Sequence, residues 1–204
     1  MLINVSDGLA HLAADLAHRR SGLPACQAAF ARFRLAARSH DPVPSIVMDT
    51  SRYRNEASIV IECPAEDLYD LVADVSQMGR WSPVCTGGSY DDDGEWFTGT
   101  NAIGDSTWET RCRVVVADRG REFTFSNHGL EGRVEMVRWG FRFRALDRAR
   151  TEVTQSWEVM PAYPEGLGVD EDSATQVLDM MKQLAVPGMP ETLAALKQDA
   201  EARL

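Results

Sequence analysis

Seven segments between residues 56 and 160 alternate apolar with polar side chains, the period of a β-strand that buries one face. Trp139, Phe141 and Phe143, for example, are separated by a glycine and an arginine. Short stretches rich in Asp, Asn and Gly separate the segments, as turns between antiparallel strands do. The predicted strands lie near residues 56–62, 85–91, 96–101, 107–118, 121–126, 133–146 and 151–160.

A helix is predicted directly after the first strand. Pro64 ends that strand because it has no N–H to donate, and its fixed φ suits the first turn of a helix. A short second helix and a corner at Trp81-Ser82-Pro83 follow. The apolar side chains that share one face of the first helix are Leu68, Leu71, Val72 and Val75.

The last predicted element is a long helix from about residue 171 to residue 202. Pro187 and Pro190 interrupt it, but the apolar side chains before and after them keep nearly the same helical phase. This pattern predicts a kink in one continuous helix rather than a reversal of the chain. The helical stripe consists of Val177, Leu178, Met181, Leu184, Ala185, Met189, Leu193 and Leu196.

Two more amphipathic helices are predicted before the sheet, one over residues 5–20 and one that begins at Pro24. We expect residues 1–45 to form a helical hairpin with a stiff, proline-containing linker, and residues 50–204 to form the main domain. Short helices are marginal alone in water, so the hairpin needs a protein surface on which to pack. The candidates are its own sheet, a second copy in a homodimer, or a separate carrier protein.

Several stretches, taken in order, resemble the START-like (SRPBCC) superfamily, and within it the polyketide cyclase/dehydrase and lipid-transport group. The resemblance implies an α+β helix-grip fold: a seven-stranded curved antiparallel sheet around a long, kinked C-terminal helix, preceded here by the helical hairpin. The matching stretches, between about residues 52 and 204, are LYDLVADVSQMGRWSPVC, GEWFTGTN, WETRCRVVVADRGREFTF, VRWGFRF and TEVTQSWEVMPA.

Composition excludes several partners. The 204-residue chain has a formal net charge of −10, which argues against nucleic acid and against an anionic membrane surface. Its apolar runs are far shorter than the ~20 residues that span a bilayer. The N-terminus lacks the features of a secretion signal, and the four cysteines form no C-x-x-C pair. These features predict a cytoplasmic protein with reduced thiols and without a membrane partner.

Basic residues are concentrated in the predicted hairpin. Residues 17–40 contain five arginines and no acid, so the rest of the chain is strongly acidic. A solvated helix face explains this pattern, and so does docking on the acidic main domain or on an acidic carrier protein.

No established catalytic motif occurs in the sequence. It has no G-x-S-x-G, no H-E-x-x-H, no phosphate-binding loop and no dinucleotide fingerprint, and we expect neither cofactor nor metal. His11 and His18 are separated by about 10 Å along one helix, too far to share an ion. His128 is predicted in a turn at Asn127 to Gly132.

The inward positions of the strands instead predict a binding cavity, because aromatic walls with a few hydrogen-bonding groups are typical of small-molecule sites. A plain hydrophobic core is the alternative for each aromatic residue. The predicted ligand-binding residues are Trp81, Phe97, Asn101, Trp108, Thr110, Trp139, Phe141, Gln155, Trp157 and Met181.

Three functions remain open from the sequence: an enzyme, a non-catalytic carrier, and an interaction module that acts through the helical hairpin. The resemblance implies a cyclase, aromatase or dehydratase that folds a hydrophobic, oxygenated substrate and polarises its carbonyls. The inward positions contain no His, Asp or Glu, which favours a non-catalytic carrier of a lipid-like ligand. An enzymatic role is therefore left undecided.

Overall fold

The computed structural model describes residues 47–104, 106–129 and 132–203. The predicted N-terminal hairpin, its linker and any contact they make lie outside these residues. The described part begins just before the first strand and contains the whole of the predicted sheet and C-terminal helix.

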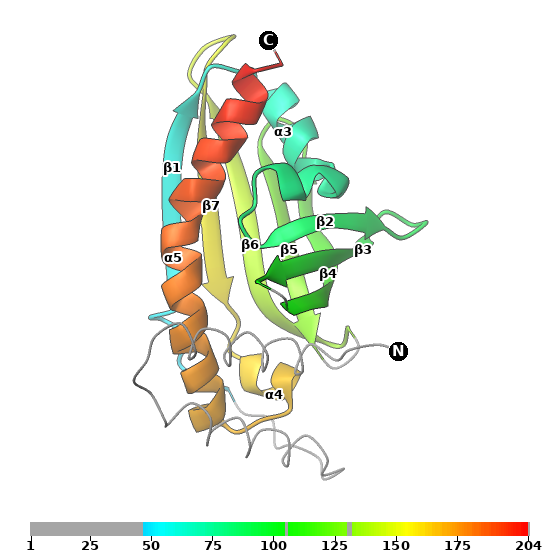
Figure 1. The fold of residues 1–204 in the computed structure, drawn as a ribbon, viewed down its shortest axis with the longest axis vertical. Coiled ribbons are helices and arrows are strands. Elements are labelled where there is room, and N and C mark those ends of the chain that lie inside the picture. Colours follow the sequence, from blue (N-terminus) through cyan, green and yellow to red (C-terminus); the bar gives the residue numbers. More distant parts are fainter. Residues whose placement is uncertain (1–46, 105, 130–131, 204) are drawn as a thin grey trace.

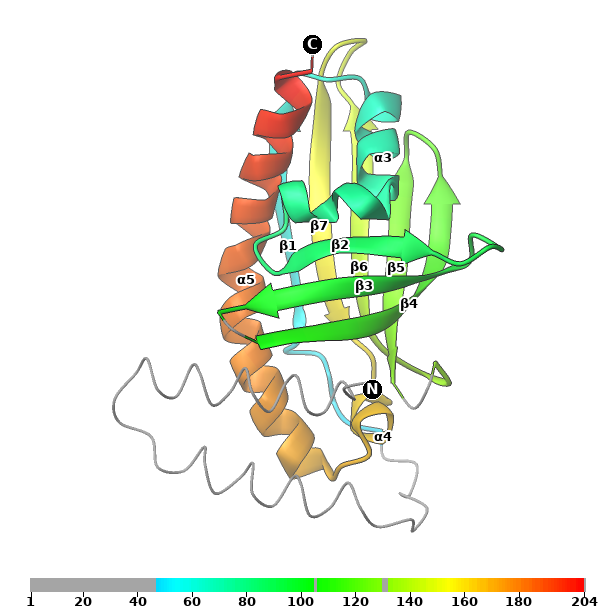
Figure 2. The ribbon, with the colours of Figure 1, turned by 45° about the vertical axis from the view of Figure 1, so that its right-hand side comes forward.

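Seven antiparallel strands form one sheet in the order β1-β7-β6-β5-β4-β3-β2. The sheet bends so strongly that β2, β3 and β4 run across the molecule while β1, β7 and β6 stand upright (Figures 1 and 2). Regular alternation of buried and partly buried positions, clearest in β7, leaves one face for the interior. The strands are β1 (Arg54–Ile61), β2 (Cys85–Tyr90), β3 (Trp96–Ile103), β4 (Ser106–Asp118), β5 (Glu122–Gly129), β6 (Val134–Ala145) and β7 (Thr151–Val159).

In the described part of the chain, four helical elements cover the concave face and its ends. Helix α3 (Ala65–Ala73) and the 3-10 helix η1 (Val75–Arg80) follow β1, as the sequence predicts. The short helix α4 (Tyr163–Leu167) closes the lower end of the sheet in Figure 1. We did not predict α4, because a single turn of helix is too short to show a period.

Helix α5 (Glu171–Glu201) runs along the open side of the sheet (Figure 1). It passes through Pro187 and Pro190 without a break, which confirms the predicted continuity. Within the described chain, neither this helix nor any other is long and apolar enough to cross a membrane.

Polar contacts fix α5 against the edge strand β1. The Lys197 ammonium donates to the backbone carbonyl of Val60 at 2.9 Å, and the backbone N–H of Glu62 donates to Glu201 at 3.0 Å. At the other end the Tyr53 hydroxyl, fully buried with its ring, donates to Asp179 at 2.8 Å. The helix is thus held at both ends, and its middle lies over the concave face.

The interior consists of two clusters of buried side chains. One packs α3, η1 and the C-terminal half of α5 on the sheet, and the other packs α4 and the N-terminal half of α5. Trp139 contacts both clusters from β6. This arrangement confirms the predicted helix-grip architecture and places the space between sheet and helix at the centre of the molecule.

Candidate functional site

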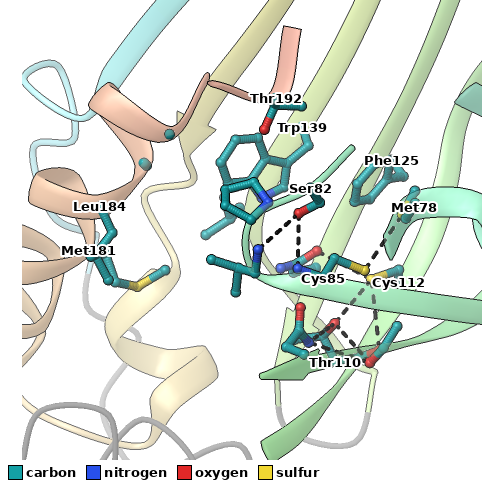
Figure 3. Close-up of a pocket in the computed structure, with 18 of the residues that line it drawn as sticks. Met78, Ser82, Cys85, Thr110, Cys112, Phe125, Trp139, Met181, Leu184 and Thr192 are labelled. Atoms are coloured by element: carbon teal, nitrogen blue, oxygen red, sulfur yellow. Dashed lines mark hydrogen bonds between the residues drawn. The ribbon is translucent and has the colours of Figure 1, made fainter. Parts of the chain in front are cut away.

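A cavity of about 220 Å³ lies between the concave face of the sheet, the corner after η1 and the middle of α5. In Figure 3, Met181 and Leu184 of α5 lie on one side of it, and Thr110 and Cys112 lie opposite. Its walls are mainly apolar, as in small-molecule sites. The other lining residues include Met78, Trp81, Ser82, Pro83, Val84, Cys85, Phe97, Gly99, Asn101, Ile103, Trp108, Phe125, Asn127, Val137, Trp139, Phe141, Gln155, Tyr163, Gly188, Met189 and Thr192.

The sheet wall carries a connected group of uncharged polar side chains. The Asn101 amide of β3 lies 3.3 Å from Thr110 Oγ1 of β4, which in turn lies 3.4 Å from the carbonyl oxygen of Gly99. The Cys112 thiol of the same strand donates to Asn127 Oδ1 of β5 at 3.3 Å. Three neighbouring strands thus bring hydrogen-bonding groups to one part of the wall.

A second polar position lies at the corner after η1. The Trp81 ring meets Phe141 edge-on, with 5.6 Å between centroids, and Phe141 is directly opposite Gln155 in the β6–β7 register. Trp81 Nε1 and Gln155 Oε1 are buried, and neither has a hydrogen-bond partner among the described residues. A buried polar group without a partner costs free energy, and because neither atom has surface open to the cavity, this cost lies inside the wall and does not mark a ligand contact.

The two thiols in the wall are poor nucleophiles. Burial raises the pKa of Cys85, and it raises the pKa of Cys112 to about 12. A thiol in this range stays protonated at neutral pH, and the thiolate is the reactive form. Covalent chemistry at these cysteines is therefore disfavoured.

His128 lies within β5, not in the turn that we predicted. The strand extends to Gly129 through a register shift between Asn127 and His128. The ring of His128 is half-buried: Nε2 lies 2.9 Å from Ser126 Oγ, and Nδ1 lies 3.1 Å from the carbonyl oxygen of Gly132. The carbonyl can only accept, so Nδ1 carries the proton and Nε2 accepts from the serine hydroxyl.

This environment predicts a pH dependence of stability. Burial lowers the pKa of His128, against the opposing effects of Glu135 and the Gly132 carbonyl. The unfolded chain therefore binds a proton more readily than the folded one, and stability falls as the pH drops through about 6.5. Wild type should lose stability between pH values of about 7.5 and 5.5 in urea titrations.

The variant His128→Gln isolates this contribution, because glutamine cannot titrate. Its stability should change less than that of wild type over the same pH window. Carboxylates with lowered pKa, such as Asp70 and Asp91, lose their contribution mainly at lower pH. Equal slopes for variant and wild type would contradict the assignment to His128.

Nine of the ten predicted ligand-binding residues line the cavity together; Trp157 does not. Trp157 is fully buried in the cluster beneath α5, and its ring lies 6.4 Å from that of Trp139, its direct partner in the register. Our expectation that it faces the cavity was wrong, because the N-terminal half of α5 covers its part of the sheet.

Several lining residues were not predicted from the sequence, most notably Asn127, Ser82 and Thr192. Asn127 continues the inward alternation of Phe123 and Phe125, a signal that we overrode by placing it in a turn. Arg80, which directly precedes the corner at Trp81-Ser82-Pro83, pairs with Asp199 of α5 and does not line the cavity. Among the described residues, no group of three or more His, Cys, Asp or Glu side chains could hold a metal ion.

A curved sheet that encloses a cavity with its C-terminal helix defines a helix-grip protein. Residues 53–201 match the family described as polyketide cyclase / dehydrase and lipid transport, and the chain belongs to this family. A search of functionally curated proteins found no significant match.

Solved structures agree with this assignment. A polyketide-cyclase-like protein of Corynebacterium glutamicum is 33% identical, with 74% of this chain and 92% of that chain covered and a TM-score of 0.50. A START superfamily protein of Mycobacterium smegmatis is 16% identical, with coverage of 74% and 99% and a TM-score of 0.55. The Zhui aromatase/cyclase of Streptomyces sp. R1128 is 17% identical, with coverage of 74% and 94% and a TM-score of 0.51. At 16% and 17% sequence identity, the likeness to the last two structures concerns the fold alone.

Proposed function

We propose that this protein binds a hydrophobic, oxygenated small molecule in the cavity between sheet and helix. The observation that carries the proposal is the combination of mainly apolar walls with a connected group of uncharged polar side chains, Asn101, Thr110 and Asn127, on the sheet wall. A ligand oxygen would find hydrogen-bond partners at these side chains, and the apolar walls would bind its hydrocarbon part. Membership of a family that includes lipid transport agrees with this function.

A cyclase or dehydratase activity is the second candidate, and the polar sheet wall is the observation that favours it. Asn101, Thr110 and Asn127 could polarise carbonyl groups of a folded chain without themselves exchanging protons. Proton transfer has less support: His128 lines the cavity, but both of its ring nitrogens already have partners. Binding is therefore the function that the site supports best.

Filling the cavity should abolish binding. Leu184 lies on α5 at the cavity wall and is only partly buried, so Leu184→Trp should place an indole in the cavity with little loss of stability. We expect the dissociation constant for the neutral fluorophore Nile red to rise at least about tenfold, equivalent to about 1.4 kcal/mol.

The matched control is Leu146→Trp, because Leu146 is exposed, and this variant should bind Nile red like wild type. Native mass spectrometry of the purified protein would identify any molecule that copurifies. Unchanged binding by the Leu184 variant, with a normal circular dichroism spectrum, would contradict binding in this cavity.

A further inference from the structure

The polar groups in the cavity wall indicate which chemical class of ligand the cavity can bind. Among the described lining residues there is no Asp, Glu, Lys or Arg. The side chains that can hydrogen-bond include three carboxamides (Asn101, Asn127 and Gln155) together with hydroxyls, thiols and an indole N–H. Except for the His128 imidazole, all of these groups are uncharged near neutral pH.

Each carboxamide both donates and accepts. Asn127 Oδ1 accepts from the Cys112 thiol, and the Asn101 amide nitrogen lies within 3.5 Å of three acceptors. Within the described chain, Asn127 Nδ2 and Asn101 Oδ1 make no hydrogen bond of their own. The wall therefore has a donor and an acceptor left for a neutral polar group, such as a carbonyl or a hydroxyl.

A charged ligand group would find no counter-charge in this wall. The desolvation of a carboxylate or an ammonium is costly unless an opposite charge or several strong hydrogen bonds replace the water. Arginines that adjoin lining residues in sequence are already paired with acidic side chains, for example Arg80 with Asp199 and Arg111 with Asp91. Neither arginine is among the lining residues.

We propose that the cavity selects uncharged ligands, ketones or alcohols, over carboxylates of the same shape. The ligand's oxygen is held at the Asn101–Thr110–Asn127 wall, and its hydrocarbon part lies against Met181 and Leu184 of α5, across the cavity in Figure 3. This inference rests on the proposed function, since it names the ligand class of the same site. Anionic fatty acids would then be excluded as ligands, whereas neutral lipids and polyketide-like carbonyl compounds would be accepted.

Matched probe pairs test the selection. Acetylnaphthalene and naphthoate, substituted at the same ring position, differ only by a methyl group in place of a carboxylate oxygen, and methyl nonyl ketone and decanoate form the linear pair. Binding is measured by isothermal titration calorimetry at about pH 8, far above the carboxyl pKa of about 4 in water. At this pH only about one carboxylic acid in 10⁴ is protonated, so, if the anion is excluded, we expect each ketone to bind on the order of 10⁴-fold more tightly than its carboxylate.

The pH dependence provides a second readout. If only the protonated acid enters, the apparent affinity for the carboxylate should rise about tenfold when the pH falls from about 8 to about 7, while the ketone affinity stays constant. A ketone preference below tenfold at the higher pH, or a preference that does not change with pH, would overturn the inference. Binding of no member of either pair would contradict the proposed function itself.

A separate experiment tests the proposed orientation of the ligand in the cavity. Thr110→Val removes a hydroxyl from the polar wall at nearly constant volume and should weaken acetylnaphthalene binding about fivefold, with naphthalene binding unchanged. Leu184→Ala should weaken the binding of both compounds, because it removes contact with the hydrocarbon part. Circular dichroism verifies that both variants are folded. Loss of naphthalene and acetylnaphthalene binding to the same extent in Thr110→Val would contradict the assigned orientation.

Discussion

Replacing Trp157 with alanine is expected to lower the free energy of unfolding by about 3–5 kcal/mol, the range found for buried aromatic residues. Trp157 is fully buried on β7 and belongs to the cluster that holds α4 and the N-terminal half of α5. Truncation removes a large apolar surface and leaves a space that its neighbours cannot fill without moving. Urea titration followed by circular dichroism measures the loss.

Trp139→Ala is the matched control, since Trp139 is the direct partner of Trp157 in the register but lines the cavity and is only partly buried. Its truncation should cost less stability and should weaken Nile red binding. Trp157→Phe should be tolerated better than alanine, because it keeps most of the ring and removes an N–H that has no partner. Equal losses for Trp157→Ala and Trp139→Ala would contradict the division between core and cavity wall.

Gly79→Ala is expected to have the second large effect. A Cβ atom at Gly79 would lie 2.3 Å from the carbonyl oxygen of Thr86 and 2.8 Å from its carbonyl carbon. Both are backbone atoms of β2, so no flexible side chain can yield. The clash would separate η1 from β2 and shift the corner at Trp81 to Val84 that lines the cavity. We expect a loss of about 3 kcal/mol, the upper end for overpacking, and weaker Nile red binding.

Gly188→Ala provides the comparison at another glycine of the cavity wall. The nearest atom to its added Cβ would be Pro83 Cγ at 3.8 Å, an ordinary contact. Since Gly188 lies inside α5, alanine should raise stability by up to about 1 kcal/mol through its better helix propensity. If the Gly79→Ala variant had the same stability and the same Nile red affinity as wild type, the corner would be free to move, contrary to the packing described above.

The sequence by itself determined the strands and the face that each one buries. Side chains alternate between the two faces of a strand, so Trp108 and Thr110 could be assigned to the interior from local pattern alone, whereas Phe97 and Asn101 were placed there by the resemblance to the family. The apolar stripe that keeps its phase across Pro187 and Pro190 likewise predicted one continuous α5. These features are local, and the folded structure retains them because all of the strands face the same interior.

Only the tertiary structure decided what covers each part of that interior. Trp139 and Trp157 have the same phase and are direct partners, yet one lines the cavity and the other lies under α5. His128 also lines the cavity, and it follows a register shift that no alternation shows. The two-residue alternation of side chains indicates which face of a strand a residue lies on. The path of a helix over that face depends on contacts between residues far apart in the chain, such as Tyr53 with Asp179. The boundary between solid core and cavity is therefore a property of the packed molecule.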